Sequence, residues 1–243
     1  MFEAITLEVC VDSADGLARA IEGGADRIEL CGALEIGGLT PSAGLIRAAS
    51  SCPIPVVAMI RPRGGDFCFT EAEVTLMLLD IEAVAAGGLP GVVLGASLPD
   101  GRLDERVLER LVRHATSLGL RCTLHRAIDL CPDLSQAVNH AIDLGFERIL
   151  TSGGAASAPA GLDGLRRCFE AAAGRIAIMP GAGINADNVD LLRAQLPLSE
   201  VHASCSEPVP PPSPQVAAFG FDSGARRRTS SAKVAALKAK LLG

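Results

Sequence analysis

Eight short runs of apolar and β-branched residues, each followed by a stretch with helical spacing, constrain the fold more than any other feature of this sequence. The runs occupy residues 5–11, 27–31, 56–60, 91–95, 121–126, 148–152, 175–180 and 200–204. Strict alternation of strands and helices is typical of a parallel sheet. Eight such units in 243 residues favour a closed barrel over an open doubly wound sheet, which usually has about five or six strands. The sequence therefore predicts a single (β/α)8 barrel domain of the TIM type over residues 1–243.

The stretches between the runs carry helix signals. Apolar residues recur at helical spacing in residues 13–24, 42–50, 71–88, 103–119, 133–145, 161–174, 185–196 and 230–243. Thr70, Asp133 and Asn185 stand where helix N-caps are expected, and glycines such as Gly87 and Gly145 follow the helices.

A proline-rich segment, PVPPPSP at residues 208–214, separates the last strand from the last helix. Too little chain follows it to fold alone, so residues 206–230 are predicted to form a long loop or a flexible lid rather than a domain linker. The arginines at 226–228 could face an anion or simply water.

Composition narrows the class of partner. The net charge of −6 opposes non-specific attraction to nucleic acid or to an anionic membrane. Tyr and Trp are absent, so platforms for base stacking have little to be built from. No basic leader with an apolar core and no apolar run of about 18 residues is present, so we expect a cytoplasmic protein. Its eight cysteines are then expected to be reduced.

Polar residues gather at the ends of the predicted strands, which is where barrel enzymes place their chemistry. Glu8 and Cys10 share one face of the first strand, and Glu29 and Cys31 share one face of the second. Inward-facing carboxylates would need counter-charges, for which Arg61 and His125 are the predicted sources. The alternative is that the Glu–Arg pairs are structural struts.

Three loops add candidate ligand-binding groups. The loop RPRGGDFCF at 61–69 predicts an anion clamp of Arg61 and Arg63, or a turn in which Asp66 holds one of the arginines. His125 is a candidate proton carrier or ligand. The GAG loop at 181–183 predicts a phosphate cradle, or merely a tight turn. The candidate substrate-binding residues are Arg63, Asp66, Arg126, Asp129, Ser152, Gly181, Gly183, His202 and Ser204.

The cysteine spacing does not match a closed zinc site, because no Cys-x-x-Cys motif occurs. Two soft thiolates, from Cys10 and Cys31, could instead bind Cu(I). Any single cysteine can equally be a small buried apolar residue.

The successive motifs LEVCVDS, GADRIELC, GGLTPSAG, MIRPRGGDF, TLHRAID, RILTSG, GAGI and EVHAS resemble those of the CutC family of copper homeostasis proteins. The resemblance runs from about residue 5 to 205. It implies a cytosolic barrel, often dimeric, that handles copper, with Cys10 and Cys31 as Cu(I) ligands. Small departures are Phe69 where Tyr is common, Leu124 and Ile128 in place of phenylalanines, and Pro180 before the GAG loop.

Three functions follow as hypotheses. The first is cytosolic binding and handling of Cu(I) by a homo-oligomer, presumed dimeric from the resemblance. The second is an enzyme that performs acid–base chemistry on a small anionic metabolite, such as a phosphorylated one, with Glu8, Glu29, Arg61 and His125 as the catalytic group and Glu29 or His125 as the base. The third is a structural or interaction role. The expected partners are a copper ion or that metabolite, and neither nucleic acid nor membrane.

Overall fold

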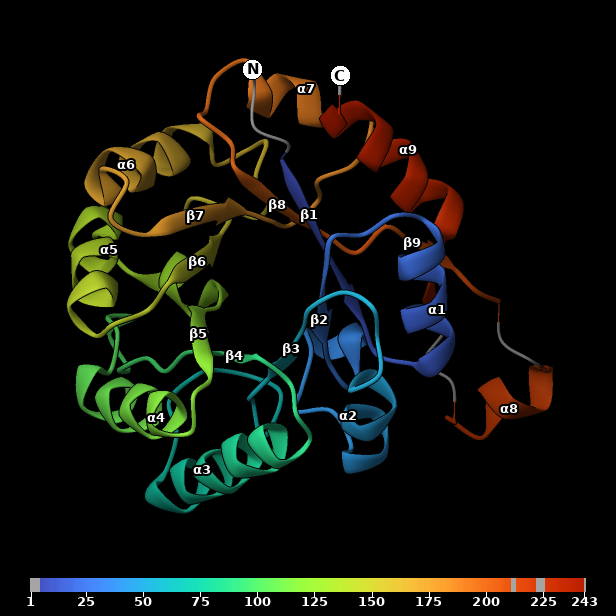
Figure 1. Ribbon diagram of the computed structural model, residues 1–243, viewed down its shortest axis with the longest axis horizontal. Coiled ribbons are helices and arrows are strands. Elements are labelled where there is room, and N and C mark those ends of the chain that lie inside the picture. Colours follow the sequence, from blue (N-terminus) through green and yellow to red (C-terminus); the bar gives the residue numbers. More distant parts are fainter. Residues whose placement is uncertain (1–4, 211–212, 222–225, 243) are drawn as a thin grey trace.

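Eight parallel strands alternate with helices around a central axis in the computed structural model, which describes residues 5–210, 213–221 and 226–242 (Figure 1). The strands are β1 Thr6–Val11, β2 Arg27–Leu30, β3 Val56–Met59, β4 Gly91–Leu94, β5 Arg121–Leu124, β6 Arg148–Thr151, β7 Ala177–Pro180 and β8 Glu200–Ala203. Hydrogen bonds join them in the order β7-β6-β5-β4-β3-β2-β1-β8. β7 and β8 lie side by side, and no backbone ladder joins them within the described residues. The predicted (β/α)8 barrel is confirmed.

The outer layer consists of helices at the predicted places. They are α1 Ala14–Glu22, α2 Ala43–Ala49, α3 Glu71–Ala86, α4 Glu105–Ser117, α5 Leu134–Asp143, α6 Leu162–Ala172, α7 Val189–Arg193 and α9 Ser231–Leu242. Two 3-10 turns, η1 Leu34–Ile36 and η2 Arg126–Leu130, follow β2 and β5. None of the helices in the described ranges is long and apolar enough to cross a bilayer.

Two of the three predicted caps are observed. Thr70 accepts a hydrogen bond from the Glu73 amide and completes a capping box, and Asp133 caps α5. Asn185 is different, because α7 begins only at Val189. The Asn185 side chain instead accepts from the amide of Asp187, two residues on. A short turn stabilised by asparagine therefore replaces the predicted first turn of the helix.

The main apolar core lies between the strands and the helices. Residues that alternate along each strand, such as Leu7 and Val9 on β1 and Ile28 and Leu30 on β2, are fully buried in it. The alternate positions point into the barrel, where a smaller apolar cluster of Cys31, Val57, Met59 and Val93 accompanies charged side chains. The barrel interior is therefore partly polar beneath its mouth.

The described residues after β8 form two short strands and a short helix before α9. β9 Ser206–Pro208 pairs with β10 Arg227–Thr229 as an antiparallel two-stranded sheet. The short helix α8 Pro214–Ala218 lies outside the ring of helices in Figure 1. Residues 211–212 of the proline-rich stretch lie outside the described residues. A lid role for residues 206–230 stays a prediction.

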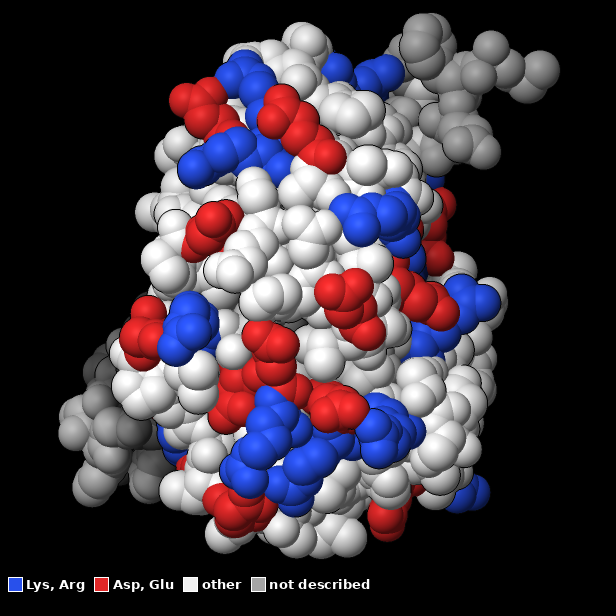
Figure 2. Space-filling view, turned by 90° about the vertical axis from the view of Figure 1, so that its left-hand side faces the viewer, with Lys and Arg blue, Asp and Glu red and all other residues white. Residues whose placement is uncertain are grey.

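Exposed charges on the side of the barrel shown in Figure 2 are interleaved in sign. Glu71, for example, pairs with Arg106 and Arg110 at 2.7 Å each. Exposed pairs of this kind typically contribute about 1 kcal/mol or less to stability. The charges that bear on function are the buried ones inside the barrel.

Candidate functional site

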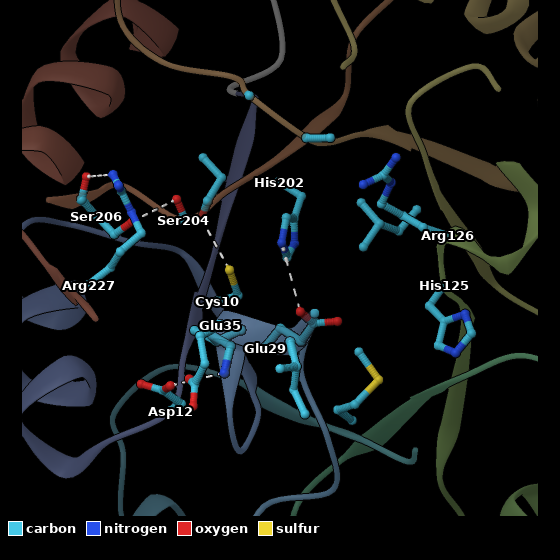
Figure 3. A pocket seen from close by; sticks show the side chains of 18 of the residues that line it. Cys10, Asp12, Glu29, Glu35, His125, Arg126, His202, Ser204, Ser206 and Arg227 are labelled. Atoms are coloured by element: carbon cyan, nitrogen blue, oxygen red, sulfur yellow. Dashed lines mark hydrogen bonds and ion pairs between the residues drawn. The ribbon is translucent and has the colours of Figure 1, made fainter. Parts of the chain in front are cut away.

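A cavity of about 500 Å³ opens at the carboxyl ends of the strands. Its wall includes residues from the ends of β1, β2, β3, β5 and β8, from the GAG loop and from β10. Figure 3 shows Cys10, Glu29 and His202 at its centre, with His125 and Arg126 to one side and Ser206 and Arg227 to the other. The cavity lies where the fold class places ligand sites.

Three adjacent strands bring one thiol, one carboxylate and one imidazole together. In the β1–β2 ladder Cys10 lies opposite Glu29, and β8 carries His202 next to β1. One potential ligand atom of each residue lies within 4.8 Å of the others. The Nε2 atom of His202 is 3.8 Å from Oε2 of Glu29. We call these three buried residues the metal-ligand triad, because thiolate, imidazole and carboxylate all bind transition metals.

Glu8 lies behind this triad. Its Oε1 is 2.9 Å from Nδ1 of His202, and its Oε2 accepts a very short hydrogen bond from Arg27. Burial alone would raise the pKa of Glu8, but the contacts with His202 and Arg27 lower it to about 2. Glu8 is therefore an ionised residue that fixes the His202 ring and leaves Nε2 facing Glu29.

The charges of His202 and Glu29 depend on each other. Burial would lower the pKa of His202, yet the contacts with Cys10, Glu29 and Glu8 raise it well above its usual value. Burial raises the pKa of Glu29, and the charge of His202 opposes that shift. Within the triad, the charge of the imidazole therefore lowers the pKa of the carboxyl, and the charge of the carboxylate raises the pKa of the imidazole.

A chain of ion pairs supports Glu8 from below. Arg27 contacts Glu200 at 2.9 Å, and Arg148 contacts the same carboxylate at 2.8 Å. These residues come from β2, β8 and β6, so the pairs cross the barrel interior. The prediction that Arg61 and His125 balance Glu8 and Glu29 is wrong, because Arg27 and His202 lie beside these carboxylates instead. Arg27 stands two positions before Glu29, and Glu200 stands two positions before His202. Each pair therefore shares one strand face, and this spacing could have indicated the two residues as partners inside the barrel.

Cys31 lies close to the triad but is not part of it. Its thiol donates a hydrogen bond to Oε2 of Glu29 at 3.6 Å, and the side chain is fully buried beside Met59 and Val93. Burial and the nearby Glu29 carboxylate raise the pKa of Cys31 well above its usual value. The two thiols predicted as a pair therefore flank Glu29, and only Cys10 lies in the cavity wall.

Arg61, Phe67 and His125 form another part of the wall. The Arg61 guanidinium donates to the carbonyls of Ile36, Gly38 and Gly65 at 3.1, 3.2 and 2.7 Å. It also lies 4.8 Å from the centre of the Phe67 ring, and the His125 ring lies 4.7 Å from that centre. We call this group the Arg61–His125 wall.

His125 is a neutral imidazole. Its Nδ1 accepts from the Ala127 amide at 3.1 Å, while its buried Nε2 has no partner within the described residues. Burial, followed by the charge of Arg61, lowers the pKa of His125 to about 3. With Nδ1 acting as an acceptor, Nε2 carries the proton.

The other loop candidates are mostly engaged with each other. Arg63 contacts Asp66 at 2.9 Å and Glu73 at 2.5 Å, and neither Arg63 nor Asp66 belongs to the cavity wall. Arg126 does belong to it, although it donates to Asp129 at 2.8 Å and to Ser152 at 2.9 Å.

The GAG loop reaches the cavity through Ala182 and Gly183. Both have positive φ angles, 73° and 76°. Gly181 lies beneath them, where an added Cβ would come within 2.5 Å of Leu150 and 3.3 Å of His202. Ser204 belongs to the wall and lies 3.1 Å from Ser206 between their hydroxyl oxygens. Acidic Asp12 and Glu35, which the sequence analysis did not single out, also line the cavity.

Fold and site together define a (β/α)8-barrel protein with a candidate metal centre at its mouth. Comparison with known proteins supplies the family: the CutC family model matches residues 5–207, and the chain belongs to the CutC family. It is 55% identical over 237 residues to a CutC family protein of Rhizobium meliloti (strain 1021), covering 98% of this chain and 96% of that one. A CutC family protein of Caulobacter vibrioides (strain NA1000 / CB15N) is 51% identical, covering 95% and 94%.

A solved structure agrees with this assignment. The CutC protein of Streptococcus agalactiae superposes with a TM-score of 0.77 at 30% identity, covering 82% of this chain and 98% of that one. The resemblance on which the sequence analysis relied is therefore confirmed.

Proposed function

We propose that this protein handles copper in the cytosol by binding Cu(I) as cargo at the metal-ligand triad. The main support is that Cys10, Glu29 and His202 each place a potential ligand atom within 4.8 Å of the other two, in the wall of the cavity. Cu(I) prefers soft thiolate ligands and also accepts imidazole. The name of the Streptococcus agalactiae relative refers to copper homeostasis.

The hydrogen bond between Glu8 and His202 supports this proposal. Metal-binding histidines usually donate the proton of their other ring nitrogen to a carboxylate, which orients the ring and makes the ligand nitrogen more basic. The Glu8 carboxylate lies 2.9 Å from Nδ1 of His202 and is held by Arg27. Nε2 is thus the ring nitrogen left to bind an ion, which must displace the proton that the raised pKa of His202 keeps on the ring.

Cys31 has a secondary place in the proposal. Its thiol donates a hydrogen bond to Glu29, and the residue is not part of the cavity wall. It can join an ion only after its proton is lost and its hydrogen bond to Glu29 is broken. We therefore expect Cys10 to matter more than Cys31, in contrast with the equal roles that the sequence suggested.

An anaerobic Cu(I) titration against a colorimetric competitor tests the proposal. Cys10→Ser should lower the Cu(I) affinity by at least about 100-fold, because a hydroxyl is a poor ligand for a soft ion. Cys31→Ser should have a smaller effect. Cys52→Ser is the matched control, since Cys52 lies outside the cavity wall. Unchanged stoichiometry and affinity in Cys10→Ser would remove the proposal.

The second candidate is an acid–base enzyme that acts on a small anionic metabolite. The cavity at the mouth of the barrel favours it, as does the pKa of Glu29, which burial raises and which makes this carboxylate a stronger base. A thermal-shift screen of phosphorylated and carboxylated metabolites on wild type and on Glu29→Gln tests it. A screen without any stabilising metabolite would count against this candidate.

A further inference from the structure

We infer that the Arg61–His125 wall is a binding site for the carboxylate group of a small organic acid. The site is independent of the proposed copper function, because it uses none of the three residues of the metal-ligand triad. Two unpaired buried donors and the way in which Arg61 is held support this site.

Buried polar atoms without a partner are rare and call for an explanation. Among the described residues four buried side-chain atoms have none: Oε1 of Glu29, Nε of Arg61, Oγ of Ser97 and Nε2 of His125. Three of these four belong to residues in the wall of this one cavity. Two of the three are nitrogen atoms that carry protons, and both contact Phe67 through their side chains. The Arg61–His125 wall thus offers two donors and no internal acceptor for them.

Within the described ranges, no carboxylate pairs with the buried positive charge of Arg61. Its side chain is 5% exposed, and its partners within the described residues are three backbone carbonyls. Arg63, on the same loop, and Arg126, after β5, each pair with an aspartate. A buried charge is costly without a counter-charge. The three carbonyls fix the guanidinium in place, so an incoming anion meets a group that is already oriented.

His125 adds a neutral donor beside this charge. The ring is 3% exposed and is confined by Gly95, where an added Cβ would come within 2.5 Å of two ring atoms. With Nδ1 occupied by the Ala127 amide, Nε2–H is the free donor. Its pKa of about 3 means that it stays neutral at physiological pH.

The number of free donors favours a carboxylate over a phosphate. The Arg61 guanidinium already donates three hydrogen bonds to carbonyls, so few of its five N–H donors remain for a ligand. The rest of the cavity wall carries both signs of charge, with Asp12, Glu29 and Glu35 opposed by Arg126, Arg227 and Arg228, so these charges do not select between the two anions. A carboxylate has a single charge and two coplanar oxygens, which match one guanidinium edge. A cavity of about 500 Å³ leaves room for a small organic molecule attached to it.

Calorimetric titration tests the inference on metal-free protein, desalted after chelation, at constant ionic strength and pH 7. The probes are acetate, succinate and citrate, with inorganic phosphate as the polyanion. We expect saturable binding of a carboxylate by wild type. Arg61→Lys should weaken it at least about ten-fold, because an ammonium cannot form the bidentate contact. Arg102→Lys is the matched control, as Arg102 is exposed and lies outside this cavity; its affinity should equal that of wild type.

A second variant protects the test if Arg61→Lys fails to fold. His125→Asn keeps an acceptor for the Ala127 amide, because asparagine is a favoured cap, but it removes the Nε2–H donor. It should weaken carboxylate binding about five-fold or more, the loss of one hydrogen bond. The inference is overturned if no carboxylate binds saturably, if phosphate binds more tightly than all three acids, or if His125→Asn binds as wild type does. Since the protein is free of metal, each of these results leaves the copper proposal untouched.

Discussion

Acid lability is the consequence of the buried His125 that can be worked out most fully. The pKa of this imidazole is lowered from 6.5 to about 3 by burial and by the charge of Arg61, against a weaker effect of Asp129. In the unfolded chain His125 binds a proton below about pH 6.5, whereas in the folded protein it does so only near pH 3. The contribution of His125 to stability therefore falls as pH falls through this window, and it is constant above about pH 7.

The magnitude follows from the size of the shift. Each pH unit below 6.5 costs about 1.4 kcal/mol until the folded pKa is approached. At pH 5 the loss is therefore about 2 kcal/mol. For a chain of this length that corresponds to a fall in Tm of about 4–8 °C.

Urea unfolding followed by far-ultraviolet circular dichroism at several values between pH 5 and 7 measures this loss. Circular dichroism suits this chain because it has no Trp or Tyr to report by fluorescence. In His125→Asn the slope of stability against pH should be smaller by about 1.4 kcal/mol per unit below pH 6. His114→Asn is the control, since His114 is partly exposed and contacts Glu82 on the surface. If His125→Asn keeps the slope of the wild type, the reasoning about a neutral buried imidazole is wrong.

Two further substitutions test the supporting structure. Glu8→Gln should lower Cu(I) affinity about 10–100-fold, because the carboxylate that orients His202 is lost; competitor titration measures this, and an unchanged affinity would argue against His202 as a ligand. Gly95→Ala places a Cβ within 2.5 Å of the His125 ring and should destabilise the protein by about 1–3 kcal/mol, as urea unfolding would show; a change below about 0.5 kcal/mol would mean that the ring is free to move.

The location of the site could be predicted from the sequence, but which of its side chains contact each other could not. Glu8, Cys10, Glu29 and Cys31 were expected at one mouth because they stand near the ends of strands. Their partners depend on the barrel stagger, which places Cys10 opposite Glu29 and Glu8 opposite both Arg27 and His202. That offset separates Glu8, which orients His202, from Glu29, which faces the cavity.

Residues far apart in the chain were the hardest to place. His202 was expected only as a substrate-binding residue. In the structure, one of its ring nitrogens lies within 4.8 Å of the Cys10 sulfur and of a Glu29 carboxylate oxygen. Phe67 was not singled out at all, although it contacts both Arg61 and His125. The spacing of these residues along the chain predicts neither set of contacts.

The sequence by itself determined the fold class, the places of the strands and most helices, the family, and the end of the barrel at which polar groups gather. These properties follow from local periodicity, capping residues and strand alternation, which act within a few residues of the chain. The tertiary structure alone decided which carboxylate balances which cation and that Cys31 donates a hydrogen bond to Glu29 while Cys10 faces the cavity. It also decided that Arg61 has no acidic partner in the part of the chain that the structure describes. Those outcomes depend on distances across a closed barrel, where strand register, rather than sequence separation, sets which side chains meet.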